Sequence, residues 1–83
     1  MNTTTAPHIL VIDDDPDMRD LVVEYLGKND MRVSARASGR EMFELIDSEP
    51  IDLVLLDLRL PGEDGLRLAR ELRERATLPI VLL

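Results

Sequence analysis

The stretch ILVIDDDPD, residues 9–17, joins four aliphatic residues directly to a run of carboxylates and a proline. A continuous aliphatic run of this kind is typical of a strand that is covered on both faces of a parallel sheet. From Met18 onward, apolar residues recur at helical spacing. Asp15 is placed to cap that helix, with Pro16 at its first position and Gly27 just past its end. The sequence therefore predicts a buried strand that meets a helix at a cluster of negative charge.

The same alternation of strand and helix continues along the chain. The expected strands cover residues 8–12, 31–35, 51–57 and 79–83. Ser38, three residues before Glu41, opens a second helix, and Asp64 is a possible cap for a third. The third helix is expected to turn four apolar residues inward: Leu66, Leu68, Ala69 and Leu72. This order predicts an α/β fold, a doubly wound parallel sheet with helices on both faces.

Length and composition limit the possible functions. With 83 residues, the chain can make at most one domain, over residues 8–83, after a short polar tail, residues 1–7, that we expect to be disordered. The net charge of −7 argues against direct binding of a nucleic-acid backbone. There is no cysteine, no signal-peptide pattern and no apolar run long enough for a membrane, so a cytoplasmic protein is expected.

Three aspartates stand at the carboxyl ends of two expected strands. Asp13 and Asp14 follow the first strand, and Asp57 ends the third. If those strands are neighbours, the three side chains converge where open α/β sheets place their sites. Converging carboxylates repel one another and need a compensating cation. Oxygen ligands favour Mg²⁺ or Ca²⁺, with Mg²⁺ the usual choice for few protein ligands and a phosphate, and a carboxylate there can attack phosphorus.

Two segments carry a family resemblance: ILVIDDDPDMRDLV, residues 9–22, and DLVLLDLRLPGEDGL, residues 52–66. They resemble the first and third strand segments of bacterial response-regulator receiver domains, with LPGEDGL closest to the OmpR-type branch. The resemblance implies that Asp57 is the phosphoacceptor. It also implies that Asp14, Asp57 and the Arg59 backbone carbonyl hold Mg²⁺, while Asp13 orients the ion. In that family a sensor histidine kinase donates the phosphoryl group.

The resemblance has further implications for the whole protein. It implies a flavodoxin-like receiver fold with strand order 2-1-3-4, truncated after the fourth strand, with a switch Ser or Thr and a Lys expected beyond Leu83. The protein is then expected to be a phosphoacceptor switch rather than an enzyme. It would contact DNA only through a further, transcription-regulating domain. An exposed sheet face and an unpaired fourth strand predict that this fragment forms homo-oligomers.

Two other interpretations concern the same acidic run. Asp13, Asp15, Asp17 and Glu24 match acidic positions of an EF-hand loop, but Met18 occupies the position that requires glycine, and a strand precedes the loop. Asp13 and Asp15 also resemble the nucleophile and acid of haloacid-dehalogenase-type phosphatases, although that family has Thr or Val where Asp17 stands. A phosphatase fragment therefore remains an alternative.

A third alternative is a degenerate receiver that serves only for protein contacts, which the intact aspartates of the expected site argue against. His8, the one histidine, stands at the start of the first strand. With no second histidine to form a ligand pair, we expect it to be an ordinary surface residue.

Overall fold

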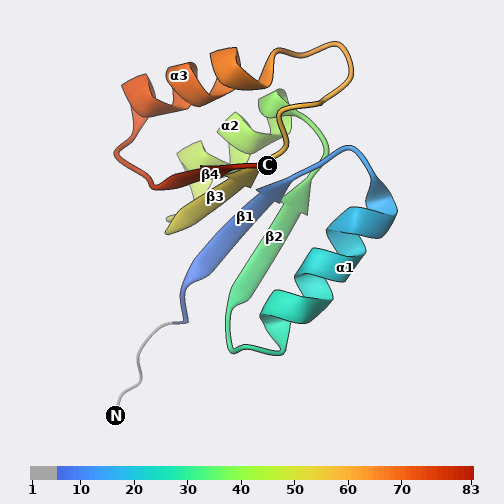
Figure 1. Cartoon of the computed structure of the whole chain (residues 1–83). Helices are drawn as coiled ribbons and strands as arrows, with labels where there is room; N and C mark the ends of the chain where they lie inside the picture. The colour runs from blue at the N-terminus through green and yellow to red at the C-terminus, as the bar shows by residue number, and fades with distance from the viewer. Residues whose placement is uncertain (1–5) are drawn as a thin grey trace.

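Strands and helices alternate along residues 6–83, the part of the chain that this computed structural model describes. The elements are β1 (His8–Ile12), α1 (Pro16–Gly27), β2 (Arg32–Arg36), α2 (Gly39–Ser48), β3 (Leu53–Leu56), α3 (Gly65–Arg75) and β4 (Ile80–Leu82). The four strands are parallel, in the order β2-β1-β3-β4. Figure 1 shows α1 on one face of the sheet and α2 and α3 on the other. The predicted α/β class and strand order are confirmed.

Every residue of the central strand β1 is buried. Leu10 and Ile12 belong to the core cluster that includes residues of α2, β3 and α3. Because side chains alternate along a strand, Ile9 and Val11 point to the opposite face, where α1 lies. The aliphatic run at the start of the chain is therefore covered on both faces, as its composition predicts.

Helix α1 begins as predicted and ends one residue later than predicted. The Asp15 side chain accepts a hydrogen bond of 2.9 Å from the Asp17 backbone N–H, which caps the first turn. Gly27 is the last helical residue and Lys28 is the C-cap, so the prediction that Gly27 lies past the end is wrong. A residue in the left-handed conformation commonly follows the end of a helix and is usually glycine. Here Asp30, with φ of 64°, has that conformation, so Gly27 does not need to adopt it.

The apolar side of α1 packs less deeply than its spacing suggests. No α1 residue is fully buried; Val22 and Leu26 are half-buried, and three apolar residues are exposed: Met18, Leu21 and Tyr25. The strands that α1 contacts most are β1 and β2. Within the described residues, therefore, only the part of the apolar side of α1 that lies above β1 and β2 is covered.

Several expected boundaries and environments differ from the observed ones. Strand β2 is shifted by one residue, and β3 and β4 are shorter than predicted, since loops take up their ends. In α3, Ala69 and Leu72 are buried and Leu68 is half-buried, but Leu66 is 52% exposed, so the prediction for Leu66 is wrong. In the first turn of α3 it is Gly65, packed against Leu58 of the preceding loop, that is buried, and Leu66 is left exposed.

His8 is buried, at 3% exposure, so its prediction as a surface residue is wrong. Its Nε2 lies 2.7 Å from the Ser34 hydroxyl, and its backbone N–H donates a 2.7 Å hydrogen bond to the Asp52 carboxylate. The reason is that β1 lies between β2 and β3, so even its first residue is covered.

Two further expectations concern the N-terminal tail and membrane-spanning segments. Of the predicted tail, residues 1–5 lie outside the described residues, and Ala6 and Pro7 precede β1 without regular secondary structure. Within residues 6–83, none of the helices has the length and hydropathy needed to cross a membrane.

Candidate functional site

Strands β1 and β3 end level with each other at the carboxyl edge of the sheet. Ile12 is paired with Leu56, so the residues that follow them, Asp13 and Asp57, leave the sheet side by side. The Asp57 backbone N–H donates to the Ile12 carbonyl at 3.0 Å, and the Asp13 N–H donates to the Arg36 carbonyl at 3.1 Å. Both aspartates are thus fixed by the last hydrogen bonds of the sheet.

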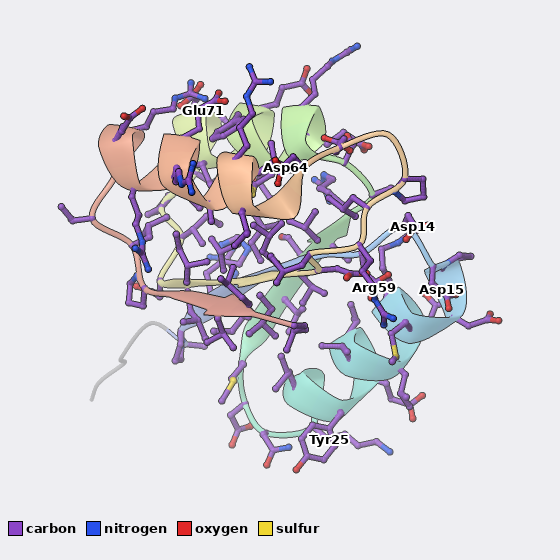
Figure 2. All side chains as sticks on the ribbon, turned by 45° about the horizontal axis from the view of Figure 1, so that its top comes forward. Asp14, Asp15, Tyr25, Arg59, Asp64 and Glu71 are labelled. Carbon is purple, nitrogen blue, oxygen red and sulfur yellow. The ribbon has the colours of Figure 1, made fainter. Side chains whose placement is uncertain are left out.

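The structure brings three of the predicted site residues together. One carboxylate oxygen from each of Asp13, Asp14 and Asp57 lies within 4.8 Å of the other two. Asp13 and Asp57 are half-buried, whereas Asp14 is exposed. These residues line an open cleft of about 460 Å³, together with Asp15, Met18 and Arg59. Figure 2 shows Asp14, Asp15 and Arg59 at this edge, beside the start of α1, while Tyr25 lies toward the other end of that helix.

Backbone hydrogen bonds orient two of the carboxylates. The Asp15 N–H donates to Oδ1 of Asp13 at 3.0 Å, and the Arg59 N–H donates to Oδ1 of Asp57 at 2.8 Å. Each bond joins residues two apart in a tight loop, a local arrangement that Asp favours at turns. Rotation of both side chains is therefore restricted before any ligand binds.

The donor set fits a small, hard divalent cation. All three candidate ligands are carboxylates, and Mg²⁺–oxygen distances of about 2.1 Å place opposite ligands about 4.2 Å apart. Neighbouring ligands of the same octahedron lie about 3.0 Å apart, so the oxygens of Asp13, Asp14 and Asp57, mutually within 4.8 Å, would have to draw closer together to share one ion. Such an ion would also relieve the repulsion among them. Arg59 lines the same cleft, and the role of its backbone carbonyl stays a prediction.

Sequence reasoning missed two neighbours of this cluster. Met18, treated only as part of the apolar side of α1, lines the cleft. Arg19, one turn into α1, donates a hydrogen bond of 2.8 Å from Nη1 to the backbone carbonyl of Asp13. Both residues could have been found from the sequence, because the first turn of a helix capped by Asp15 has to lie beside the loop that precedes it.

The EF-hand interpretation is excluded because α1 occupies most of the proposed loop.

The sequence profile of the response regulator receiver domain family matches residues 9–83. Among characterised proteins, the transcriptional regulatory protein AruR of Pseudomonas aeruginosa is 46% identical over 84 aligned residues, which cover 94% of this chain and 34% of AruR. The TorCAD operon transcriptional regulatory protein TorR of Escherichia coli is 41% identical over 75 residues, 90% of this chain and 33% of TorR. The chain spans about a third of the length of these relatives.

Solved structures give the same family. The receiver domain of TorR, the response regulator of the TMAO respiratory system, aligns with a TM-score of 0.87 and 39% identity over 92% of this chain and 63% of that one. TrrA of Thermotoga maritima, in complex with Mg²⁺ and BeF, aligns with a TM-score of 0.86 and 35% identity over 92% of this chain and 67% of that one. TrrA has also been solved with the histidine kinase ThkA, where it aligns with a TM-score of 0.85 and 35% identity, over 92% of this chain and 66% of that one.

Proposed function

This chain belongs to the response regulator receiver domain family of two-component signalling, and we propose that it accepts a phosphoryl group from a sensor histidine kinase onto Asp57. The observation that carries the proposal is the meeting of Asp57 with Asp13 and Asp14 at one sheet edge. Receiver domains are phosphoacceptor switches, so the only reactions expected of the chain are its own phosphorylation and dephosphorylation. Uptake of phosphate from a small acyl-phosphate donor, followed by mass spectrometry, tests the proposal.

The proposed transfer needs only a positioned nucleophile and charge compensation. A carboxylate oxygen of Asp57 attacks phosphorus while the bond from phosphorus to the kinase imidazole breaks, and the imidazole leaves with the electron pair and takes up a proton. The Arg59 N–H already holds Oδ1 of Asp57, so the carboxylate is oriented in advance.

We assign Mg²⁺ to the three clustered carboxylates. Asp14 and Asp57 would hold the ion together with the Arg59 carbonyl and waters, and Asp13 would orient it directly or through a water. A bound Mg²⁺ would offset the negative charge that gathers when an anionic carboxylate meets an anionic phosphoryl group. The supporting observation is an all-oxygen donor set of suitable spacing on this chain. The relative TrrA, solved with Mg²⁺ and BeF, gives independent support.

Replacing Asp14 with Asn is expected to weaken Mg²⁺ binding without unfolding the protein. The substitution removes a full negative charge and leaves a weaker amide ligand. Loss of a group that only supports a metal ligand costs about 10- to 100-fold in affinity, so loss of a direct ligand should raise the Mg²⁺ Kd by at least about that much. Asp14 is exposed, so stability should change little. Calorimetric titration with MgCl₂ measures the Kd, with Asp20→Asn, an exposed carboxylate on α1, as the matched control. An unchanged Kd in Asp14→Asn would remove Asp14 from the site.

The relatives support a proposal about the partners of the whole protein. Receiver domains pair with sensor histidine kinases, as in the complex of ThkA with TrrA. The relatives AruR and TorR are transcriptional regulators of about three times this length. We therefore propose that the protein controls transcription in the cytoplasm through a separate DNA-binding domain, since a segment with a net charge of −7 is poorly suited to bind DNA itself.

We also propose that the 83-residue chain, when isolated, associates with a second copy through β4. Within residues 6–83, β4 is an edge strand paired only with β3. It exposes Val81 and Leu82, and Leu83, directly after the strand, is exposed as well. Unpaired apolar edges favour strand addition. Light scattering of the isolated chain should report dimers or larger species. The Val81→Lys variant should be monomeric, because a charged side chain on an edge strand hinders pairing with a second strand. Thr77→Lys, in the loop before β4, is the control. A monomer at high concentration without any substitution would contradict this.

A further inference from the structure

The β3–α3 loop, residues 57–64, runs from Asp57 to Asp64, the cap of α3, and it also contacts α2. Leu60 is buried in the core at 3% exposure, and the Glu63 N–H donates to the Leu60 carbonyl at 3.1 Å. Gly62, with φ of 72°, supplies the left-handed residue of this turn. The turn aims the Glu63 side chain at the start of α2.

Glu63 binds the first residue of α2. Its Oε1 accepts a hydrogen bond of 2.9 Å from the Gly39 N–H, which an α-helix leaves without an internal partner. Ser38 caps the same helix by accepting from the Glu41 N–H, so the two side chains satisfy different backbone groups. A carboxylate at a helix N-terminus is also favoured by the helix dipole. The contact is therefore a charged, specific link between α2 and the loop that carries Asp57.

The space around Gly39 supports the same link. A Cβ atom at Gly39 would lie 2.7 Å from Oε1 of Glu63 and 2.5 Å from Cδ2 of Leu68. Both distances are shorter than side-chain atoms tolerate, so even the methyl group of alanine at this position would displace both the Glu63 carboxylate oxygen and the tip of the Leu68 side chain. Gly39 thus leaves the space that the Glu63 carboxylate occupies beside the backbone.

We propose that Glu63 is a positioning residue for phosphoryl transfer: its bond to Gly39 fixes the loop in which the Arg59 N–H orients the Asp57 carboxylate. This inference rests on the proposed function, because the reaction is the one proposed for Asp57. In-line transfer is sensitive to placement, and an error of about 1 Å can cost about 100-fold in rate. The burial of Leu60 still restrains the loop when the bond is lost, so Glu63→Ala should slow phosphorylation about 10-fold.

The test compares matched variants of the protein at its natural length, with acetyl phosphate and MgCl₂ as the probe. Glu63→Gln keeps an acceptor oxygen and should stay within about threefold of wild type, while Gly39→Ala should slow the reaction as Glu63→Ala does, about 10-fold. The double variant should be no slower than either single one. Glu71→Ala, an exposed glutamate on the outer side of α3 (Figure 2), is the control and should leave the rate unchanged.

Two further measurements report on the bond itself and on the stability of the fold. Amide exchange at Gly39 should be faster in Glu63→Ala than in wild type, whether or not the protein is phosphorylated. Rates are compared at a temperature where thermal melts show every variant folded. A lower Tm for Glu63→Ala with an unchanged rate would overturn the inference, as would unchanged exchange at Gly39. If wild type takes up no phosphate, both the proposed function and this inference fail; if wild type reacts and Glu63→Ala reacts equally fast, only the inference fails.

Discussion

Replacing Asp57 with Asn should abolish phosphate uptake while leaving the domain folded. The amide of Asn is not a nucleophile toward phosphorus, so no acyl phosphate can form at this position. Its Oδ1 can still accept the 2.8 Å hydrogen bond that the Arg59 N–H gives to Asp57. The substitution also removes one of three mutually repelling carboxylates, so the free energy of unfolding should stay equal or rise slightly. Intact-mass spectrometry after incubation with acetyl phosphate and MgCl₂ measures the uptake.

The control for this result is Asp20→Asn, which removes an exposed carboxylate on α1 away from the site cleft. It should gain one phosphoryl group, as wild type should. Equal uptake by wild type and Asp57→Asn would show that another residue is the acceptor. No uptake by wild type would instead favour a domain that serves only for protein contacts.

Replacing Leu56 with Ala should strongly destabilise the domain. Leu56 is fully buried at the end of β3, directly before Asp57, and it belongs to the core cluster between the sheet and α2 and α3. Buried Leu→Ala substitutions cost about 2–5 kcal/mol because they remove apolar contacts and leave a cavity. Native proteins have about 5–15 kcal/mol in total, so the variant should lose a large fraction of its stability. Urea titration measures the change in the free energy of unfolding.

The matched control is Leu66→Ala, the same chemical change at a residue that is 52% exposed. Its free energy of unfolding should change by about 0.5 kcal/mol or less, as is usual for surface substitutions. Equal losses at positions 56 and 66 would mean that the core does not lie where the structure places it.

The framework of this fold could be predicted because local signals agree with one another. β1 matches its prediction residue by residue, since its aliphatic run ends abruptly at Asp13. The caps at Asp15, Ser38 and Asp64 were all predicted, and each accepts a backbone hydrogen bond in the first turn of its helix. Capping residues act over three or four positions, so a single sequence contains the whole signal.

Predictions that depend on tertiary neighbours were less successful. Leu66 and Leu68 have the same apolar character, but only the orientation of α3 on the sheet determines which of them is covered. His8 is buried because β1 is flanked by two strands, which no local pattern around His8 reveals.

The candidate site also contains both features that could be predicted from the sequence and features that could not. The convergence of Asp13, Asp14 and Asp57 follows from the parallel order of the strands, so it was predictable once β1 and β3 were expected to be neighbours. The link from Glu63 to Gly39 joins residues 24 apart in sequence and depends on how a turn with a left-handed glycine aims one side chain. No spacing rule predicts such a contact.

The central claim is that Asp57 is a Mg²⁺-dependent phosphoacceptor, and locating the modified residue tests it most directly. The protein is treated with acetyl phosphate, with and without MgCl₂, and then with borohydride, which reduces an aspartyl phosphate to homoserine. Mass spectrometry of the resulting peptides should find homoserine at position 57 only when Mg²⁺ was present. Homoserine at another aspartate, or equal modification of Asp57 without Mg²⁺, would contradict this account.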